Sequence, residues 1–459
     1  MFNLHKDAGK RVHFIGIGGI SMSGLAEILL IYGYKVSGSD RSESRITNKL
    51  KGMGAEVHIG HNAENVHGAD IVVYTAAIRE DNPEYQEAKR LNLPTYDRAE
   101  FLGYIMKEYS KSIAVAGTHG KTTTTSMLSL ILLKAGLDPT ILVGGEVDAI
   151  GGNARPGKSP YFITEACEYK GSFLKFYPYI GIILNVDADH LDYYRDIDDI
   201  YDTFLRFANL IPENGLLIGC AEDERAAKIM DEVNCNTISY GINKGNYTAG
   251  NIKYDSRGCA SFTVLYNGKV FGDFALKVPG EHNILNALAS IAAAHFLGVD
   301  KGIIASSLLE FVGTHRRFDK LGEKNGVTVI DDYAHHPTEI KATIKAAQNF
   351  SHTGKLYCVF QPHTYSRTIT LFNEFTEAFY GVDKLILADI YAARERDNGI
   401  VNSSMLNDAI AAKGIDSIYI KSFEEIVDYL EENLKPGDLL ITMGAGDVYR
   451  IGEMYLNKA

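Results

Sequence analysis

The segment Val115–Thr125, which reads VAGTHGKTTTT, constrains the fold more than any other stretch of this chain. The familiar phosphate-binding loop reads G-x-x-x-x-G-K-[ST], but Val115 stands where its first glycine is expected. We predict a strand that ends at Val115 and a helix over 121–134, joined by a turn whose N–H groups face an anion. Lys121 would then reach the outer phosphates and the Thr122 hydroxyl a Mg²⁺ ion. The alternative is a glycine turn that only joins strand to helix, but it leaves the GKT run and its three further threonines without a role.

Apolar strand patterns alternate with helical patterns in three series, which start near Val12, Ser112 and Val327. This alternation predicts parallel sheets and an α/β fold. With 459 residues and 46% hydrophobic content, the chain has room for about three domains of roughly 150 residues. We place their limits at 1–108, 109–313 and 314–459. A strand-rich stretch over 246–279 predicts β-hairpins in addition.

Charge and cysteine usage exclude several classes of protein. The net charge of −12 argues against a nucleic-acid-binding surface that is basic throughout. The five cysteines are scattered and lack C-x-x-C spacing, which indicates free thiols rather than a zinc site or a disulfide framework. Residues 1–10 contain no apolar signal region, and no apolar run approaches the roughly 20 residues of a membrane helix. We therefore expect a cytoplasmic enzyme that binds neither nucleic acid nor membrane.

A second glycine turn follows the first predicted strand. The run Gly16-Ile-Gly18-Gly19-Ile-Ser21 nearly fits G-x-G-x-x-G, and Asp40 ends the next strand, where dinucleotide-binding folds place an acid that binds ribose. The chain shows no nicotinamide site, so a nucleotide diphosphate other than NAD fits the turn better. The alternative interpretation is a tight packing turn.

Polar residues follow two further apolar strands. Glu165 ends the strand that starts at Tyr161, and His190 closes the N-x-x-x-D-H run that follows the strand at Ile180. Because the carboxyl ends of parallel strands gather at one edge of a sheet, Glu165 and His190 can converge on metal ions near the γ-phosphate.

Two asparagines and a group of basic residues complete the candidate site. Asn283 and Asn286 lie three residues apart in a predicted helix and can read a purine edge, although helix capping by Asn283 is the alternative. Arg317, the DDYAHHP run over 331–337 and Arg367 lie at strand ends in the third series, where they suit carboxylate and phosphate recognition. The paired histidines could suggest a metal site, but no third ligand clusters beside them in the sequence.

Together, the motifs GTHGKTT, HNILNALA, RRF, DDYAHHPTE and QPHTYSRT resemble the Mur ligases of peptidoglycan synthesis over nearly the whole chain. The resemblance implies a Rossmann-like N-terminal domain for a UDP-sugar, a central P-loop ATPase domain with a parallel sheet plus a small β-sheet, and a Rossmann-like C-terminal domain for an amino acid. It also accounts for the shortened loop, since this family carries the G-T-x-G-K-T-T form. The motifs are most similar to those of members that join L-alanine to UDP-N-acetylmuramate with ATP, in a monomer or weak homodimer.

The resemblance also implies a role for each candidate residue. The catalytic residues would be Lys121, Glu165, His190 and Arg317, and Mg²⁺, with Mn²⁺ able to substitute, would lie on Thr122, Glu165 and His190. ATP would be bound by Gly117, Thr118, His119, Gly120, Lys121, Thr122, Thr123, Asn283, Asn286 and Asp332. The UDP-sugar would be bound by Gly16, Gly18, Gly19, Ile20, Ser21, Asp40 and Thr75. The amino acid would be bound by Tyr333, His336 and Arg367.

The sequence departs from the family pattern at several points. Thr364 stands where some relatives have a second arginine, and Cys167 and Tyr169 occur in E-A-C-E-Y, where many have E-A-D-E-S. Several sister ligases use a carbamylated lysine after the metal-binding histidine, but residues 191–212 contain no lysine. Alternative functions are a sister ligase that adds another amino acid or recycles a peptide, and a nucleotide-binding regulator without catalysis.

Overall fold

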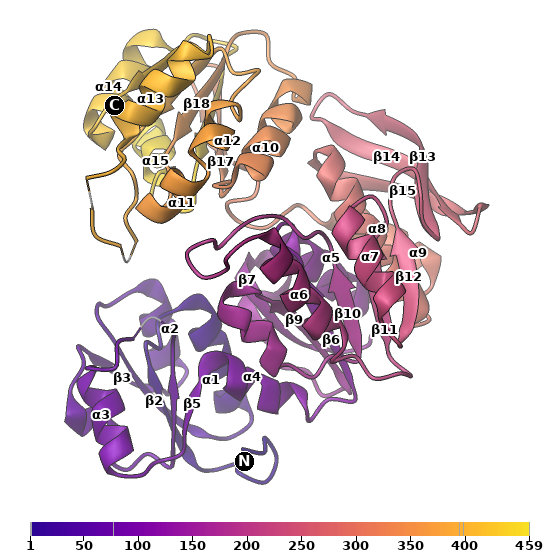
Figure 1. The fold of residues 1–459 in the computed structure, drawn as a ribbon, viewed down its shortest axis with the longest axis vertical. Coiled ribbons are helices and arrows are strands. Elements are labelled where there is room, and N and C mark those ends of the chain that lie inside the picture. The colour runs from indigo at the N-terminus through magenta and orange to yellow at the C-terminus, as the bar shows by residue number, and fades with distance from the viewer. Residues whose placement is uncertain (1, 77, 394, 398, 459) are drawn as a thin grey trace. The chain divides into compact units, whose positions relative to one another are not determined.

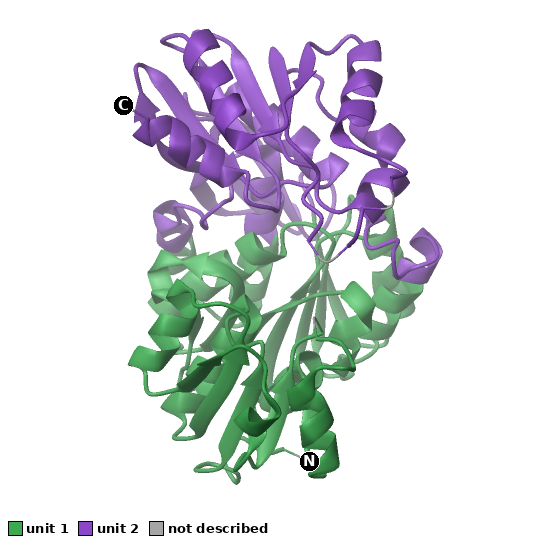
Figure 2. Cartoon of the chain, turned by 90° about the vertical axis from the view of Figure 1, so that its left-hand side faces the viewer, with its two compact units in different colours: residues 1–186, 201–240, 289–304 green, residues 187–200, 241–288, 305–459 purple. Residues whose placement is uncertain are grey.

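The computed structural model describes residues 2–76, 78–393, 395–397 and 399–458. It forms two compact units, which Figure 2 colours separately. Unit 1 comprises residues 1–186, 201–240 and 289–304, and unit 2 comprises residues 187–200, 241–288 and 305–459.

Unit 1 begins with a parallel sheet in the order β3-β2-β1-β4-β5 (Figure 1). The strands run outward from β1 to β2 and β3 on one side and to β4 and β5 on the other, so the strand order reverses beside β1, where doubly wound folds bind nucleotides. The elements of this part are β1 (Arg11–Ile15), α1 (Ile20–Ile31), β2 (Lys35–Asp40), α2 (Arg45–Gly52), β3 (Glu56–Ile59), η1 (Ala63–Val66), β4 (Ile71–Tyr74), α3 (Pro83–Arg90), β5 (Thr95–Asp97) and α4 (Arg98–Met106).

The central sheet of unit 1 has the order β12-β11-β10-β6-β9-β7-β8. Its pairings are parallel except for β7 with β8. The elements are β6 (Lys111–Ala116), α5 (Lys121–Lys134), β7 (Thr140–Val147), η2 (Asp148–Ile150), β8 (Gly152–Arg155), β9 (Tyr161–Ala166), η3 (Tyr169–Lys175), β10 (Ile180–Ile183), β11 (Leu216–Cys220), α7 (Glu224–Glu232) and β12 (Asn236–Tyr240).

Helix α1 joins these two parts of unit 1. Gly24 lies so close to β7 and β8 that a Cβ atom there would collide with Leu142 and press on Ala154. Nδ2 of Asn153 also donates to the carbonyl of Ile20. The predicted first domain therefore packs tightly against the central sheet, and the proposed limit at residue 108 remains a prediction.

Unit 2 contains antiparallel hairpins and a second doubly wound sheet. Strands β13 (Tyr247–Tyr254), β14 (Cys259–Tyr266) and β15 (Lys269–Pro279) pair antiparallel, as the alternating pattern over 246–279 predicts. The other sheet has the order β16-β17-β21-β18-β19-β20 and is parallel except for β16 with β17. Its elements are β16 (Asp319–Lys324), β17 (Val327–Asp332), α10 (Pro337–Asn349), β18 (Leu356–Phe360), α11 (Tyr365–Thr370), α12 (Phe372–Thr376), β19 (Lys384–Leu387), α13 (Ser403–Ala412), β20 (Ser417–Tyr419), α14 (Phe423–Asn433), β21 (Leu439–Met443) and α15 (Tyr449–Asn457).

Three helices contain residues of both units: α6 (Ile197–Ala208), α8 (Glu281–Phe296) and α9 (Lys301–Glu310). Among the described residues, no helix combines the length and apolar character needed to cross a membrane. The three sheets with intervening helices confirm the predicted α/β class.

Candidate active site

The first glycine turn lies at the carboxyl ends of β1 and β2. The backbone nitrogens of Gly16 and Ile17 each donate to the carbonyl of Ser39 at 2.9 Å. The nitrogen of Gly18 donates to Oδ2 of Asp40, also at 2.9 Å. Helix α1 starts at Ile20 and includes Ser21, so its N-terminus opens at this turn.

Thr75 lies beside the same turn, because its nitrogen bonds to the carbonyl of Ile15 at the end of β1. The structure thus brings together the residues predicted to bind the UDP-sugar. The carboxylate of Asp40 is engaged with backbone groups, since Oδ1 accepts the nitrogen of Arg41. Its proposed contact with ribose stays a prediction.

The second glycine turn connects β6 to α5, as predicted from the sequence, and α5 covers the predicted residues 121–134. The turn is held by Asn185, which follows β10. Its Oδ1 accepts the nitrogen of His119 at 2.8 Å, and its Nδ2 donates to the carbonyl of His119 at 3.1 Å. The nitrogen of Thr118 donates to the carbonyl of Asn185 at 3.2 Å. We did not assign this role from the sequence, although the N-x-x-x-D-H run contained the signal.

Lys121 is paired with a carboxylate that the sequence motif contained but to which we assigned no role. Its Nζ lies 2.9 Å and 3.2 Å from the two carboxylate oxygens of Glu168, and it also donates to the carbonyls of Gly117 and Thr118. Glu168 is 2% exposed. Burial by itself would lower the pKa of Lys121, but Glu168, Cys167 and Glu165 raise it above its ordinary value. Lys121 is therefore a partly buried cation at the start of α5, where an anion is favoured.

Glu165 and Thr122 lie beside two adjacent glycines of β7, Gly144 and Gly145 respectively. Oε1 of Glu165 accepts the nitrogen of Gly144 at 2.6 Å. A Cβ atom built on Gly145 would lie 3.2 Å from Cγ2 of Thr122. A hydroxyl and a carboxylate at one edge of the sheet are hard oxygen donors of the kind that Mg²⁺ prefers, so these residues fit the predicted metal.

Cys167 lies just after the end of β9 at Ala166, so it does not belong to the strand that carries Glu165. Burial raises the pKa of its thiol above the ordinary value, and Glu168 raises it further, while Lys121 lowers it. The thiol therefore interacts electrostatically with both members of the Lys121–Glu168 ion pair.

The predicted residues of unit 2 form a network centred on Asp189 and Arg367. The guanidinium of Arg367 donates to Oδ1 of Asp189 at 2.9 Å and 3.1 Å and to Oδ2 at 3.3 Å. Burial alone would raise the pKa of Asp189, but Arg367 and the neighbouring histidines lower it well below its usual range. His190 follows directly with a φ of +55°. The sequence did not identify Asp189 as a partner of Arg367, because the two lie far apart in the chain.

His336 caps α10. Its Nδ1 accepts the nitrogen of Thr338 at 3.3 Å, and its Nε2 lies 3.0 Å from the carbonyl of Ala188, so Nε2 carries the proton. With both ring nitrogens engaged, His336 positions this helix in the structure, and its proposed contact with the amino acid stays a prediction.

Two further histidines gather at the same edge of the sheet. Burial lowers the pKa of His335 to about 3 and that of His363 to about 4. Nδ1 of His363 lies 3.0 Å from Nη1 of Arg367 and therefore accepts its hydrogen bond. Both rings are thus uncharged near neutral pH, and His363 helps to hold the guanidinium of Arg367.

The RRF segment is anchored to the end of β17. Oδ2 of Asp332 accepts the nitrogen of Phe318 at 2.7 Å, and Oδ1 accepts the nitrogen of Ala334 at 2.8 Å. Burial raises the pKa of Asp332 to about 6. The guanidinium of Arg317 lies over the ring of Tyr333 at 5.1 Å, so these two predicted contacts are adjacent. The proposed bond from Asp332 to the ATP ribose stays a prediction.

Asn283 and Asn286 share one face of α8, as their spacing predicts. Nδ2 of Asn286 donates to Oδ1 of Asn283 at 3.0 Å, and Nδ2 of Asn283 donates to the carbonyl of Pro279 at 2.7 Å. Both side chains are nearly buried, and the pair is held by its own hydrogen bonds.

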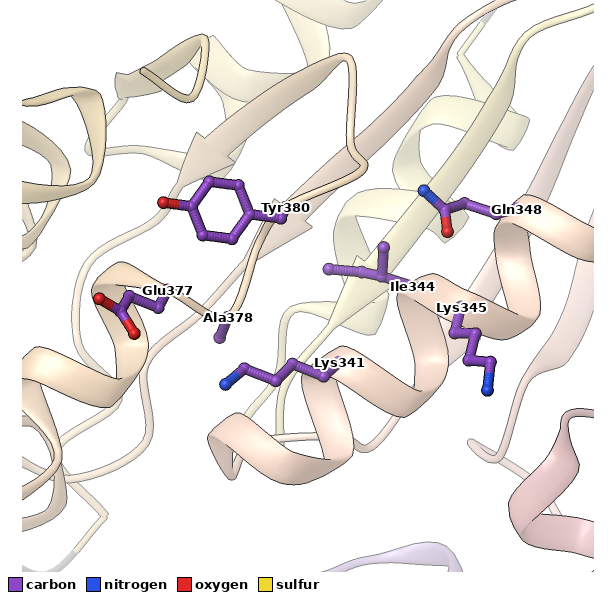
Figure 3. A pocket seen from close by; sticks show the side chains of 7 residues that line it. All are labelled: Lys341, Ile344, Lys345, Gln348, Glu377, Ala378 and Tyr380. Carbon is purple, nitrogen blue, oxygen red and sulfur yellow. The ribbon is translucent and has the colours of Figure 1, made fainter. Parts of the chain in front are cut away.

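A groove on unit 2 is formed by residues that follow two of these motifs in the sequence (Figure 3). Its buried floor is formed by Ile344 and Ala378, and Lys341, Lys345, Gln348, Glu377 and Tyr380 complete its lining. The described residues that line it include none of the predicted site residues.

Comparison with known families decides what this arrangement belongs to. Three Mur ligase models match in succession: the model of the family's catalytic domain at residues 11–110, the middle domain at 115–294 and the glutamate ligase domain at 316–446. The chain belongs to the Mur ligase family.

The Mur ligase relatives share the full length of this chain. UDP-N-acetylmuramate–L-alanine ligases of Clostridium tetani and Clostridium acetobutylicum are 59% and 58% identical, over 97% and 100% of this chain and 98% and 100% of their own. Among solved structures, the UDP-N-acetylmuramate–alanine ligase of Thermotoga maritima is similar with a TM-score of 0.83 and 31% identity, covering 98% of both chains. A murein peptide ligase of Psychrobacter arcticus is similar with a TM-score of 0.74 and 25% identity, again over 98% of both. The predicted family and three-domain α/β fold are thereby confirmed.

Proposed function

We propose that this Mur ligase joins L-alanine to UDP-N-acetylmuramate with hydrolysis of ATP to ADP and phosphate. The observation that carries the proposal is the ion pair of Lys121 with the buried Glu168 at the start of α5. The chain that contains it is similar over its length to L-alanine ligases. UDP-N-acetylmuramate, L-alanine and ATP are the proposed partners. A cytoplasmic location and a monomer or weak homodimer complete the proposal.

The chemistry requires activation of a carboxylate. A carboxylate does not react with an amine at neutral pH, because oxide is a poor leaving group. Transfer of the γ-phosphoryl group of ATP to the carboxylate of the sugar substrate releases ADP and forms an acyl phosphate. The amine of alanine then attacks the acyl carbon, the C–O bond to phosphate breaks, and the amine loses a proton. Catalysis consists mainly of positioning and of stabilising negative charge.

The residues of the site suit these steps. Lys121 leaves Glu168 or shares it, and neutralises the charge of the transferring phosphoryl group. Arg317 supports the same phosphates from unit 2, and Arg367, held by Asp189 and His363, binds the carboxylate of alanine. A domain closure that excludes water would protect the acyl phosphate from hydrolysis.

Mg²⁺ is the proposed metal, with Mn²⁺ able to substitute. Thr122 and Glu165 would hold it together with His190, phosphate oxygens and water. When bound, the ion neutralises negative charge on the phosphate oxygens.

An amino-acid panel tests the choice of substrate. We expect L-alanine to be preferred over D-alanine and over bulky residues, with glycine and L-serine as weak substrates. Some activity with near neighbours is expected because a pocket discriminates one methylene by only about 1–3 kcal/mol. The measurement is release of phosphate that depends on both UDP-N-acetylmuramate and the amino acid. A clear preference for glutamate, for a diamino acid or for a preformed peptide would contradict the alanine assignment in favour of a sister ligase.

Dependence on CO₂ gives a separate prediction. Residues 191–212 contain Arg195 and Arg206 and no lysine, and a guanidinium stays protonated and cannot form a carbamate. We expect ligation to be indifferent to bicarbonate. The assay is steady-state ligation in degassed, CO₂-free buffer, with and without bicarbonate at matched pH and ionic strength. A reversible loss of activity on removal of CO₂ would mean that a lysine elsewhere in the chain carries the carbamate.

A further inference from the structure

A buried carboxylate lies beside the first glycine turn and plays no part in the scheme above. Glu84 occupies the first turn of α3, yet its side chain is 0% exposed. Its carboxylate accepts hydrogen bonds from Oγ of Ser39 and from Nδ2 of Asn65, both at 2.5 Å, and from Nδ1 of His61 at 3.0 Å. Nε2 of His13 lies 3.8 Å away.

These donors keep Glu84 ionised. Burial alone would raise its pKa, but the nearby His13 ring and the hydrogen bonds from Ser39, Asn65 and His61 lower the pKa to about 2. An ionised carboxylate only accepts hydrogen bonds. The hydroxyl of Ser39 donates its only proton to Glu84. Toward Nδ1 of His61, 3.0 Å away, the Ser39 oxygen can therefore only accept. Nδ1 of His61 must therefore carry a proton.

The cluster is connected directly to the turn that is proposed to bind the UDP-sugar. The carbonyl of Ser39 accepts the nitrogens of Gly16 and Ile17, while its side chain bonds to Glu84 and His61. The side chain of His61 is 19% exposed, whereas those of Glu84 and His13 are fully buried. Within the described part of the chain, Nε2 of His61 makes no hydrogen bond. The ring thus has one nitrogen fixed by a buried anion, and it is linked to the Gly16–Ser21 turn through Ser39.

We propose that Glu84 is a positioning residue for nucleotide binding, and that it holds the proton of His61 on Nδ1 so that Nε2 accepts a hydrogen bond from the nucleoside of the UDP-sugar. The donor on the nucleoside is either a ribose hydroxyl or the N3–H group of uracil. The inference rests on the proposed assignment of the UDP-sugar to the Gly16–Ser21 turn.

A second pair of a glutamate on α3 with a histidine, Glu87 with His67, provides the control. Glu87 bonds to Nε2 of His67 at 2.9 Å, and the His67 side chain is 54% exposed. Glu87→Gln alters a carboxylate that also faces a histidine, three residues further along α3, but without the buried donors. We expect this variant to bind UDP as tightly as the unaltered protein.

Glu84→Gln tests the positioning role. Glutamine keeps one accepting oxygen and replaces the other with an NH2 group. When this NH2 group occupies the position of Oε2, which His61 contacts, Nδ1 of His61 becomes an acceptor and its proton moves to Nε2. We expect the affinity for UDP, measured by titration calorimetry, to fall about 3- to 10-fold, as for loss of one hydrogen bond. The ¹⁵N shifts of the His61 ring should report the transfer of the proton from Nδ1 to Nε2. Unchanged ¹⁵N shifts together with unchanged UDP affinity would overturn the proposal.

His61→Asn is the second variant and does not depend on how the first one folds. The amide nitrogen of asparagine takes the place of Nδ1 and keeps the bond to Glu84, while the group that corresponds to Nε2 is lost. We expect the same 3- to 10-fold fall in UDP affinity, with an unchanged unfolding midpoint. Binding as tight as that of the unaltered protein would refute the contact by His61.

Two UDP analogues distinguish the donors and separate this proposal from the assignment of the turn. If a ribose hydroxyl is the donor, 2′-deoxy-UDP or 3′-deoxy-UDP should bind the unaltered protein more weakly than UDP does. The same analogue and UDP should bind His61→Asn with equal affinity. If uracil N3–H is the donor, 3-methyl-UDP should behave so instead. Unaltered protein that fails to bind UDP at all would contradict the assignment of the turn. Normal UDP binding with no difference among the variants and analogues would contradict only the roles of Glu84 and His61.

Discussion

Replacement of Lys121 by alanine should lower the rate of ligation by about 10³-fold or more, in the range expected when a cation that stabilises a transferring phosphoryl group is removed. Lys121 lies at the start of α5, where its Nζ is held by Glu168 and the loop carbonyls. In the variant, the buried carboxylate of Glu168 loses its cationic partner. Its negative charge would then repel the phosphates of ATP at the proposed loop. We therefore expect ATP binding to weaken as well. The measurement is phosphate release in the presence of both other substrates.

UDP binding should survive in Lys121→Ala, because the Gly16–Ser21 turn lies on a different sheet. Lys134→Ala, at the last turn of the same helix, is the matched control and should ligate at close to the normal rate. A Lys121→Ala variant that ligates at a near-normal rate would show that another part of the chain binds the phosphates.

The second large effect is expected for Gly117→Ala. Gly117 has a φ of +140°, and a Cβ atom there would lie 2.9 Å from Cβ of Leu184 and 3.3 Å from the nitrogen of Asn185. A side chain is strained in this backbone conformation and would push the loop away from Asn185, which holds it. We expect loss of ATP binding, measured by calorimetry, with a fall in stability of about 1–3 kcal/mol.

Gly136→Ala separates the two parts of this effect. Gly136 follows the other end of α5 with a φ of +72°, and nothing lies within 4 Å of an added Cβ atom. The Gly136→Ala substitution should lower the free energy of unfolding by about 1 kcal/mol through backbone strain alone and leave ATP binding unchanged. If Gly117→Ala and Gly136→Ala bind ATP with equal affinity, then ATP binding does not depend on the close contact between Gly117 and the Leu184–Asn185 segment.

Features set by neighbouring residues were predictable from the sequence. The limits of α5 were correct because they depend on a glycine turn, a lysine and a continuous helical pattern. The hairpins over 246–279 followed from alternation, and the two glycine turns between strand and helix followed from glycines at strand ends. The motif order was specific enough to identify the family, which the full-length comparisons confirm.

Contacts between distant segments were decided only by the tertiary structure. Arg367 and Asp189 meet across 178 positions, and the sequence contained no spacing that relates them. The same holds for Asn185 with His119 and for α1 with the central sheet, where Gly24 permits a close approach.

Glu84 illustrates the physical reason most clearly. An acidic residue in the first turn of a helix is expected at the surface, where it interacts with the helix dipole. Here the fold buries it, because Ser39, His61 and Asn65 supply donors from β2 and from the segment that follows β3. The sequence by itself determined the strands, helices and glycine turns through local pattern. Only the packing of separate elements decided which charges became buried partners, since the cost of burying a charge is offset by donors that are distant in the chain.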